Sequence, residues 1–185
     1  MDRQILWDCH MHSSFSADSD TPMEVMIHRA VETGLQGITF TEHLDPDYPV
    51  TPDNLDFSLD IPAYKEKLAE LSDMYKDKIQ VRFGIELGLQ MHLGEYFDSL
   101  LSQTPFDFVI GSSHLVHGYD PYYPEFFEGR KEFLCYMEYF ESILETFPHM
   151  TDLTFTDILI MLSVMVLTGT GNILTDGIKI FWMRF

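Results

Sequence analysis

Over its first 150 residues, the chain alternates short apolar runs with longer amphipathic stretches. The apolar runs predict strands at residues 5–7, 37–40, 79–85 and 106–110. The amphipathic stretches predict helices at 22–33, 63–75, 95–101 and 131–147. Strands that alternate with helices are typical of α/β proteins with a parallel sheet. Four such units are too few to close the usual barrel, so the pattern predicts an incomplete one.

The first predicted helix has clear sequence signals at both ends. Thr21 suits the N-cap, Pro22 suits the first helical position, and Glu24 completes a capping box. Gly34 suits the left-handed residue that often ends a helix. The following segment of proline and aspartate, residues 45–60, is interpreted as a loop.

The pattern changes after residue 150. The segment 151–185 contains neither glutamate nor tyrosine, and residues 164–175 have no clear helical or strand period. Its apolar run, Ile158 to Leu167, is too short to span a bilayer. We therefore divide the chain into a domain at 1–150 and an atypical tail at 151–185.

Composition narrows the classes of partner and the compartment. The formal net charge of −19 at pH 7 argues against a nucleic-acid or membrane partner. An anionic substrate stays compatible with this charge, because bound metal ions reverse the local field. Cys9 and Cys135 form no disulfide framework, and no apolar signal segment follows Met1. These features predict a cytoplasmic protein.

Histidine and acidic side chains stand at or just beyond the end of each predicted strand. In chain order they are His10 and His12, Glu42 and His43, Glu86, and His114. A barrel brings the ends of its parallel strands to one face, so these residues are expected to converge there. Imidazole and carboxylate are the ligands that Zn, Mn and Fe prefer. The sequence therefore predicts a multinuclear metal site.

Three further residues each allow a functional and a structural interpretation. Asp18 offers an oxygen ligand, but its Ser-Ala-Asp-Ser context also fits a turn. Asp8 either orients a ligand histidine through the second ring nitrogen or belongs to a turn. His117 either supports the ligands or contacts substrate, or it has no role in the site.

The motifs resemble those of the PHP superfamily, named for polymerase and histidinol phosphatase, over residues 1–148. The opening motif, residues 8–19, resembles that of the histidinol-phosphatase branch. Thr41-Glu42-His43, Gly84-Ile85-Glu86 and Gly111-Ser112-Ser113-His114 resemble the next three motifs. The resemblance implies the N-terminal part of a distorted (β/α)7 barrel that holds up to three Fe, Mn or Zn ions.

The resemblance also implies how the ligands are shared. His10, His12 and Glu86 would bind a first metal, Glu86 and His114 a second, and Asp18 and His43 a third. Asp8, Glu42 and His117 would support these ligands or contact substrate. A metal-bound hydroxide would attack phosphorus, so no side chain is predicted to act as the nucleophile.

The family pattern continues with segments that this chain lacks: a Gly-His-x-Asp strand, an arginine-bearing stretch and a late Asp-x-His. Translation in a shifted frame from Phe155 onward permits a Gly-His-Ile-Asp segment that resembles the missing part. We therefore interpret the tail as out of frame, which sequencing the gene across codons 145–160 would test. The tail is not expected to complete the barrel, and its apolar surface suggests a homodimer.

The expected function is hydrolysis of a small phosphomonoester, with histidinol phosphate in histidine biosynthesis as the first choice. One alternative is a different phosphoester substrate. The other is a truncated metal-binding remnant without turnover, because the late ligands are absent. Activity well below that of a frame-restored chain is expected.

Overall fold

The computed structural model describes residues 6–146 and the backbone of residues 155–157. Its strands are β1 (Trp7–Met11), β2 (Gly37–Leu44), β3 (Gln80–Gly88), β4 (Phe108–Ser112) and β5 (Phe155–Asp157). They pair in that order as one parallel sheet. The helices are α1 (Met23–Thr33), α2 (Ile61–Tyr75), α3 (Gly94–Gln103) and α4 (Glu132–Thr146), with short 3₁₀ helices η1 (Met91–Leu93) and η2 (Pro124–Phe126). The predicted α/β class with an open parallel sheet is confirmed.

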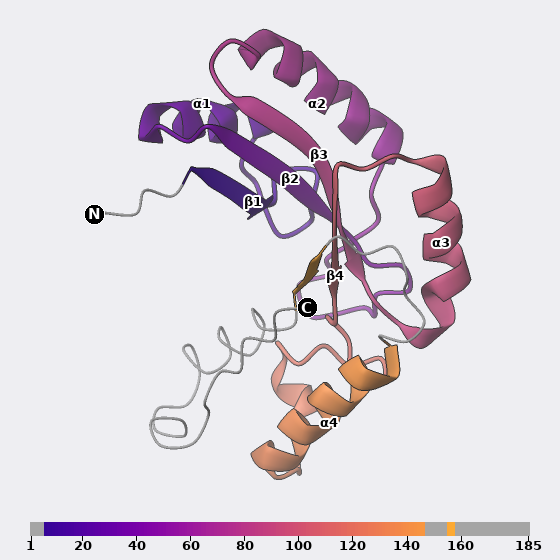
Figure 1. The fold of residues 1–185 in the computed structure, drawn as a ribbon. Helices are drawn as coiled ribbons and strands as arrows, with labels where there is room; N and C mark the ends of the chain where they lie inside the picture. Colours follow the sequence, from indigo (N-terminus) through magenta and orange to yellow (C-terminus); the bar gives the residue numbers. More distant parts are fainter. Residues whose placement is uncertain (1–5, 147–154, 158–185) are drawn as a thin grey trace.

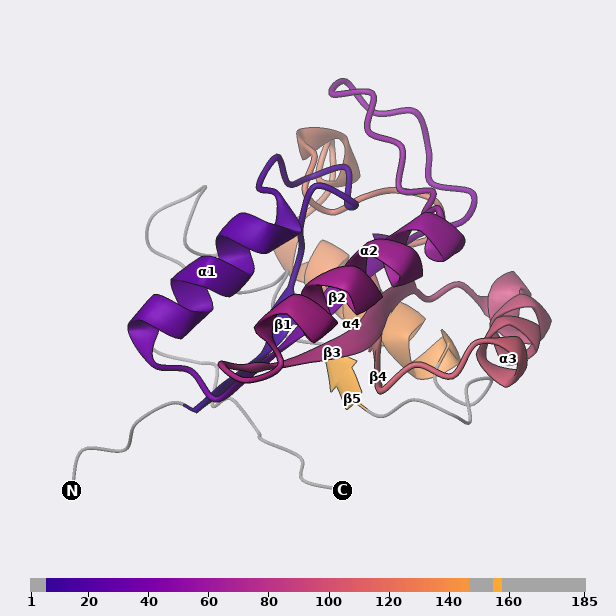
Figure 2. The same cartoon turned by 90° about the horizontal axis from the view of Figure 1, so that it is seen from above.

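Helices α1 and α2 cover one face of the curled sheet (Figures 1 and 2). Side chains alternate between the two faces of a strand, so Ile38 and Phe40 of β2 point to the same face, where both are fully buried. Tyr64 of α2 is also fully buried, and its hydroxyl donates to the carbonyl oxygens of Phe40 and Gly84. This core fixes the two central strands that carry the candidate ligands.

Two smaller hydrophobic clusters pack helices α3 and α4. Helix α3 packs through Phe97 against Ile85 and Leu87 of β3. Helix α4 packs through Cys135, Tyr139 and Ile143 against the loop that follows β4. The opposite side of α4 leaves apolar side chains exposed: Phe133, Leu134, Met137, Phe140 and Leu144. Among the described residues, no helix combines the length and apolarity needed to cross a bilayer.

The start of α1 differs from the prediction. Pro22 occupies the N-cap and its carbonyl accepts from the backbone N–H groups of Val25 and Met26, without a side-chain cap. The predicted capping box with Thr21 and Glu24 is therefore wrong. The Thr21 carbonyl instead accepts from the Ser14 N–H, which holds Thr21 in the loop after β1. Gly34 ends the helix in the left-handed conformation, as predicted (φ 82°).

The fifth strand was not predicted from the sequence. Strand β5 lies within the tail and pairs in parallel with β4, with Phe155 beside Ile110. A three-residue strand is too short to show a period of two, and the free edge of β4 offers unpaired backbone groups. The expectation of a four-stranded sheet is corrected to five. Predictions on residues 1–5, 147–154 and 158–185, including Ile158 to Leu167 and the proposed dimer, lie outside the described residues.

Candidate metal centre

Strand β3 places one acidic side chain at the middle of the site. Glu86 lies on the same face of β3 as Gly84 and Gly88, because side chains alternate along a strand. A Cβ at Gly84 would meet the Phe40 carbonyl oxygen, and one at Gly88 would meet the Asp45 carboxylate. The β2–β3 register pairs His43 with Glu86, so these two ligand candidates begin side by side.

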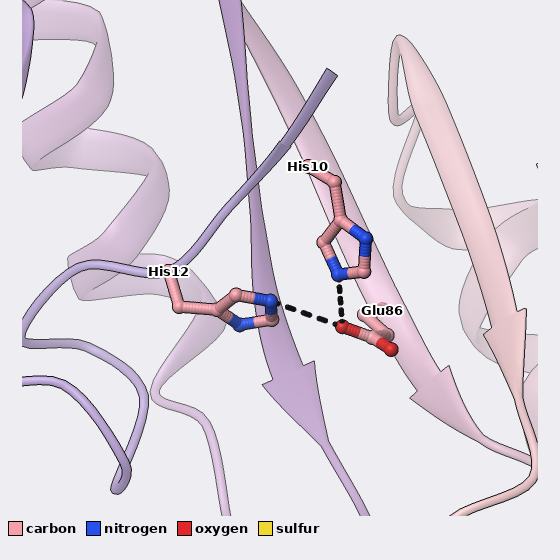
Figure 3. A group of neighbouring side chains, drawn as sticks. All are labelled: His10, His12 and Glu86. Atoms are coloured by element: carbon pink, nitrogen blue, oxygen red, sulfur yellow. Dashed lines mark hydrogen bonds and ion pairs between the residues drawn. The ribbon is translucent and has the colours of Figure 1, made fainter. Parts of the chain in front are cut away.

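Both oxygens of the Glu86 carboxylate lie close to histidine nitrogens. Oε2 lies 2.8 Å from His10 Nε2 and 3.2 Å from His12 Nε2 (Figure 3). Oε1 lies 3.1 Å from His114 Nε2 and accepts a 2.6 Å hydrogen bond from the Ser112 hydroxyl. Glu86 is 3% exposed, so its charge is balanced by these neighbours rather than by water. Burial by itself raises the pKa of Glu86, but the bonds to His10, His114 and His12 hold the pKa well below its usual value.

Ligand atoms gather into three overlapping groups. The groups are His10–His12–Glu86, His12–Asp18–His43 and His43–Glu86–His114. Within each group the ligand atoms lie within 4.8 Å of one another. Glu86, His12 and His43 each belong to two groups, so the whole is one continuous centre.

His43 connects the buried part of the centre to a more open part. Its Nε2 lies 3.4 Å from Asp18 Oδ2, and the Asp18 side chain is 41% exposed. Burial alone lowers the pKa of His43, but the nearby Asp18 and Asp45 carboxylates raise it to about 9. The two carboxylates therefore favour the protonated form of His43.

Glu42 fastens the loop that follows the first two histidines. Its fully buried carboxylate accepts hydrogen bonds from the Ser13 N–H at 2.9 Å and from the Ser13 and Ser16 hydroxyls, both at 2.6 Å. The Ser16 hydroxyl also accepts from the His43 N–H at 3.0 Å. Glu42 thus ties β2 to the loop that carries Asp18.

Comparison with known proteins connects this geometry to a family. The family model described as "PHP domain" matches residues 8–162, which is most of the chain and reaches into the segment 151–185. The chain belongs to the PHP domain family.

Relatives of this PHP domain are named as histidinol phosphatases. The Lactococcus lactis histidinol-phosphatase is 36% identical over 115 residues, which cover 62% of this chain and 41% of that protein. The probable histidinol-phosphatase of Clostridium acetobutylicum is 31% identical over 140 residues, 76% of this chain and 51% of the relative. The chain therefore spans about half the length of the curated relatives it matches.

Solved structures support the fold of the PHP domain. The L. lactis histidinol phosphate phosphatase, solved with zinc, L-histidinol and phosphate, superimposes with a TM-score of 0.76 at 31% identity. The match covers 82% of this chain and 56% of that one. A second structure, a Listeria monocytogenes protein described as a putative histidinol phosphatase, matches with a TM-score of 0.52 at 18% identity and bears on the fold alone.

The residues of this PHP domain fit a divalent metal by their chemistry. The donors are imidazole nitrogens and carboxylate oxygens, the set that zinc, manganese and iron accept. The buried His43 Nδ1 and Asp45 Oδ2 make no hydrogen bond among the described residues and lie 3.5 Å from each other. His10, His12, Asp18, His43, Glu86 and His114, the predicted ligands, are thus brought together in a centre suited to several ions.

The predicted supporting residues lie in different places. Asp8 is exposed and accepts a 3.3 Å bond from the His10 N–H, within its own strand. His117 adopts a left-handed backbone (φ 49°) and pairs with Glu138 of α4 at 3.0 Å. Neither residue belongs to the three ligand groups. Their roles stay predictions.

Sequence reasoning missed two residues of the site. Ser112 donates a hydrogen bond to Glu86. It lies within the Gly111-Ser112-Ser113-His114 motif, but no sequence signal distinguished it as functional. Asp45 contacts both His114 and His43. The signal for Asp45 was its spacing of two from His43, which places both on one face of an extended chain.

An open cavity of about 520 Å³ adjoins the centre. His43, Asp45 and His114 form part of its wall. The rest of the wall combines acids with aromatic and aliphatic side chains: Ala17, Asp18, Asp20, Tyr48, Asp53, Leu55, Phe57, Asp120, Tyr122 and Tyr123. Tyr48 donates to Asp120, and Tyr123 donates to Asp53 at 3.0 Å, so two loops far apart in sequence are joined there. No lysine or arginine of the described chain lines this cavity.

Proposed function

We propose that this centre hydrolyses a phosphomonoester in a metal-dependent reaction, with histidinol phosphate as the substrate. The observation that carries the proposal is Glu86, one buried carboxylate whose two oxygens face histidines of different ligand groups. Such a carboxylate suits two neighbouring ions, and paired ions are a recurring arrangement in phosphatases. Membership of the PHP domain family and the names of the relatives support the same reading.

The chain's own residues divide the work as follows. His10, His12 and Glu86 would hold one ion, Glu86 and His114 a second, and Asp18 and His43 a third. The structure also places His43 with the second set and His12 with the third. Bound divalent ions would neutralise phosphate oxygens and lower the pKa of coordinated water. The carboxylates would hold the ions in a net-acidic protein, so an anionic group would be attracted only at the bound ions.

The cavity suits the organic part of such a substrate. It begins at His43 and His114, so a phosphate near the ions would leave the alcohol portion among the tyrosines and acids. Asp120 accepts hydrogen bonds from the Tyr48 hydroxyl and from the Tyr122 N–H at 2.7 Å, which hold its carboxylate in the wall. Histidinol phosphate carries an amine that is protonated at neutral pH, and a wall of carboxylates and aromatic rings stabilises such a cation.

The test is phosphate release by the zinc- or manganese-loaded chain. Histidinol phosphate is compared with a phosphomonoester of similar length that lacks the amine. We expect turnover of histidinol phosphate, a higher KM for the amine-free ester, and loss of turnover in Glu86→Gln. Asp120→Asn should raise the KM for histidinol phosphate more than that for the amine-free ester.

Other outcomes would point to the two alternatives. Turnover of the amine-free ester alone would indicate a different phosphoester substrate. Tight metal binding without phosphate release from either ester would indicate a metal-binding remnant. In both cases the assignment of histidinol phosphate would be wrong.

A further inference from the structure

The carboxylate of Asp45 stands behind two histidines of the centre. Asp45 is 4% exposed and follows directly after β2. Its Oδ1 lies 2.6 Å from His114 Nδ1, and its Oδ2 lies 3.5 Å from His43 Nδ1. The opposite nitrogens, Nε2 of each ring, face Glu86 and Asp18 respectively. Asp45 therefore contacts the Nδ1 side of each ring, and the His43 Nδ1 also lies 3.7 Å from Glu86 Oε2.

We propose that Asp45 is a positioning residue that fixes the tautomer and orientation of both His43 and His114. The inference rests on the proposed metal centre and names the residue that organises it. A carboxylate accepts hydrogen bonds and donates none, so the His114 Nδ1 that lies 2.6 Å from Asp45 carries a proton. The His43 Nδ1 makes no hydrogen bond among the described residues, and at 3.5 Å it is placed to direct its proton at the same carboxylate. Each Nε2 is then left with a lone pair directed at the ligand groups. A carboxylate behind a ligand histidine has this effect in many metal sites.

One carboxylate serving two rings makes the two ligand groups dependent on each other. His114 belongs to the group with Glu86, and His43 also belongs to the group with His12 and Asp18. A neutral amide at position 45 has one acceptor oxygen instead of two. Because the His114 contact is the shorter, an asparagine at position 45 should keep its oxygen on His114. Its NH₂ group then faces His43. The His43 ring then has its lone pair on Nδ1 and its proton on Nε2, the wrong tautomer for binding beside Asp18.

The fold keeps a place for this carboxylate at Gly88. The β2–β3 register brings the chain after Leu44 beside Gly88, because Leu44 pairs with Leu87. A Cβ at Gly88 would overlap the Asp45 carboxylate, and it would lie 3.1 Å from the Asp45 Cβ. Glycine at this position is thus required by Asp45 rather than by its backbone angle.

The primary experiment compares zinc binding by the wild-type chain and by Asp45→Asn. Stepwise affinities come from competition with a chromophoric chelator, and cobalt(II) absorption reports the geometry at each site. We expect one ion per chain to bind about 10- to 100-fold more weakly in Asp45→Asn, with its cobalt band changed. The tightest ion should keep its affinity, since His10 and His12 do not contact Asp45.

A matched control exists two residues along the chain. Asp47 pairs with His92 at 3.1 Å, but both side chains are mostly exposed and lie outside the ligand groups. Asp47→Asn makes the same chemical change in an Asp–His pair and suits the positive φ of 60° at that position. It should leave every zinc affinity unchanged.

Gly88→Ala approaches the same contact from the other side. The added methyl group should displace the Asp45 carboxylate, beginning with the Oδ1 atom that contacts His114, and so weaken zinc binding although no polar atom is removed. In the double variant Asp45→Ala/Gly88→Ala, the methyl group meets no carboxylate, so zinc binding should match that of Asp45→Ala alone. This non-additivity distinguishes positioning from general damage, and circular dichroism confirms that each variant folds.

Unchanged zinc affinities in Asp45→Asn would overturn the inference and leave the proposed function intact. An equal loss at all ions would also overturn it, because it would indicate general distortion. A wild-type chain that binds no zinc, manganese or iron would defeat the proposed function and this inference together.

Discussion

The two ends of the metal centre differ in how firmly the chain holds them. At the Glu86 end, His10 and His114 contact the carboxylate of Glu86, a residue that is 3% exposed. At the Asp18 end, the carboxylate stands on a loop, is 41% exposed, and meets His43 at 3.4 Å. The comparison teaches that ligands buried on or beside strands are more firmly pre-organised than a set that is completed by an exposed side chain of a loop. We therefore expect tight binding at the Glu86 end and weaker binding at the Asp18 end.

Glu86→Gln should have the largest effect on the centre. The amide loses the charge that two ligand groups share, and its NH₂ group would face histidine nitrogens. We expect at least about 100-fold weaker binding of the ions at the Glu86 end, measured by metal content after dialysis. Unchanged metal content in a folded variant would show that Glu86 does not bridge two ions.

Glu42→Gln should loosen the Asp18 end through the loop that holds it. The Glu42 carboxylate accepts from Ser13 and Ser16, so an NH₂ group in its place would face donors instead of acceptors. We expect a loss of about 1–3 kcal/mol in the free energy of unfolding, measured in urea without metal. A variant as stable as the wild type would mean that this buried network does not hold the loop.

Asp18→Asn should affect one end of the centre alone. The change removes an exposed oxygen ligand without disturbing the core. One ion per chain should bind about 10-fold more weakly, while the affinity of the tightest ion stays the same. Equal losses at every ion would contradict the division into two ends.

The pH dependence of stability in the metal-free chain should reveal the protons that take the place of metal. The pKa of His43 is raised from 6.5 to about 9, so its contribution is complete below pH 6.5 and is lost as the pH rises through 9. Burial alone raises the pKa of Asp45, but His114 and His43 lower it from 3.8 to about 2. Its contribution is therefore present above pH 3.8 and is lost as the pH falls through 2.

These two groups make the metal-free protein most stable between about pH 4 and 6.5, as judged from urea midpoints in the presence of a chelator. Zinc should reduce the loss on the alkaline side, because a bound ion replaces the proton on His43. Stability that rises steadily from pH 6.5 to 9 without metal would show that His43 keeps no such proton.

The sequence predicted the Glu86 end better than the rest of the site. His10, His12, Glu86 and His114 are polar residues at the ends of apolar runs, and strand geometry converts that position into a common face. Asp45 was overlooked because it opens a segment of proline and aspartate that reads as a loop. Its contact with His114 joins residues 69 positions apart, which local pattern does not reveal.

For the fold, too, features set by local sequence were predicted and features set by tertiary contacts were not. The alternation of strands and helices predicted the sheet and helices α1 to α4, because amphipathic faces are properties of local sequence. The first three predicted strands ended too early, since β1, β2 and β3 continue to Met11, Leu44 and Gly88. Two further errors arose where tertiary contacts decide the outcome. Thr21 is held by Ser14 instead of capping α1, and β5 forms at the edge of β4 although three residues carry little signal.

The most direct test of the account is a crystal structure of the zinc-loaded chain with anomalous scattering recorded at the zinc edge. We predict more than one zinc peak in the centre, with His10, His12, Glu86 and His114 at about 2.0–2.3 Å from the ions. Glu86 should contact two of the peaks, and any peak beside Asp18 should have the lowest occupancy. Zinc bound elsewhere, or a folded and zinc-saturated chain without a peak at Glu86, would contradict the account.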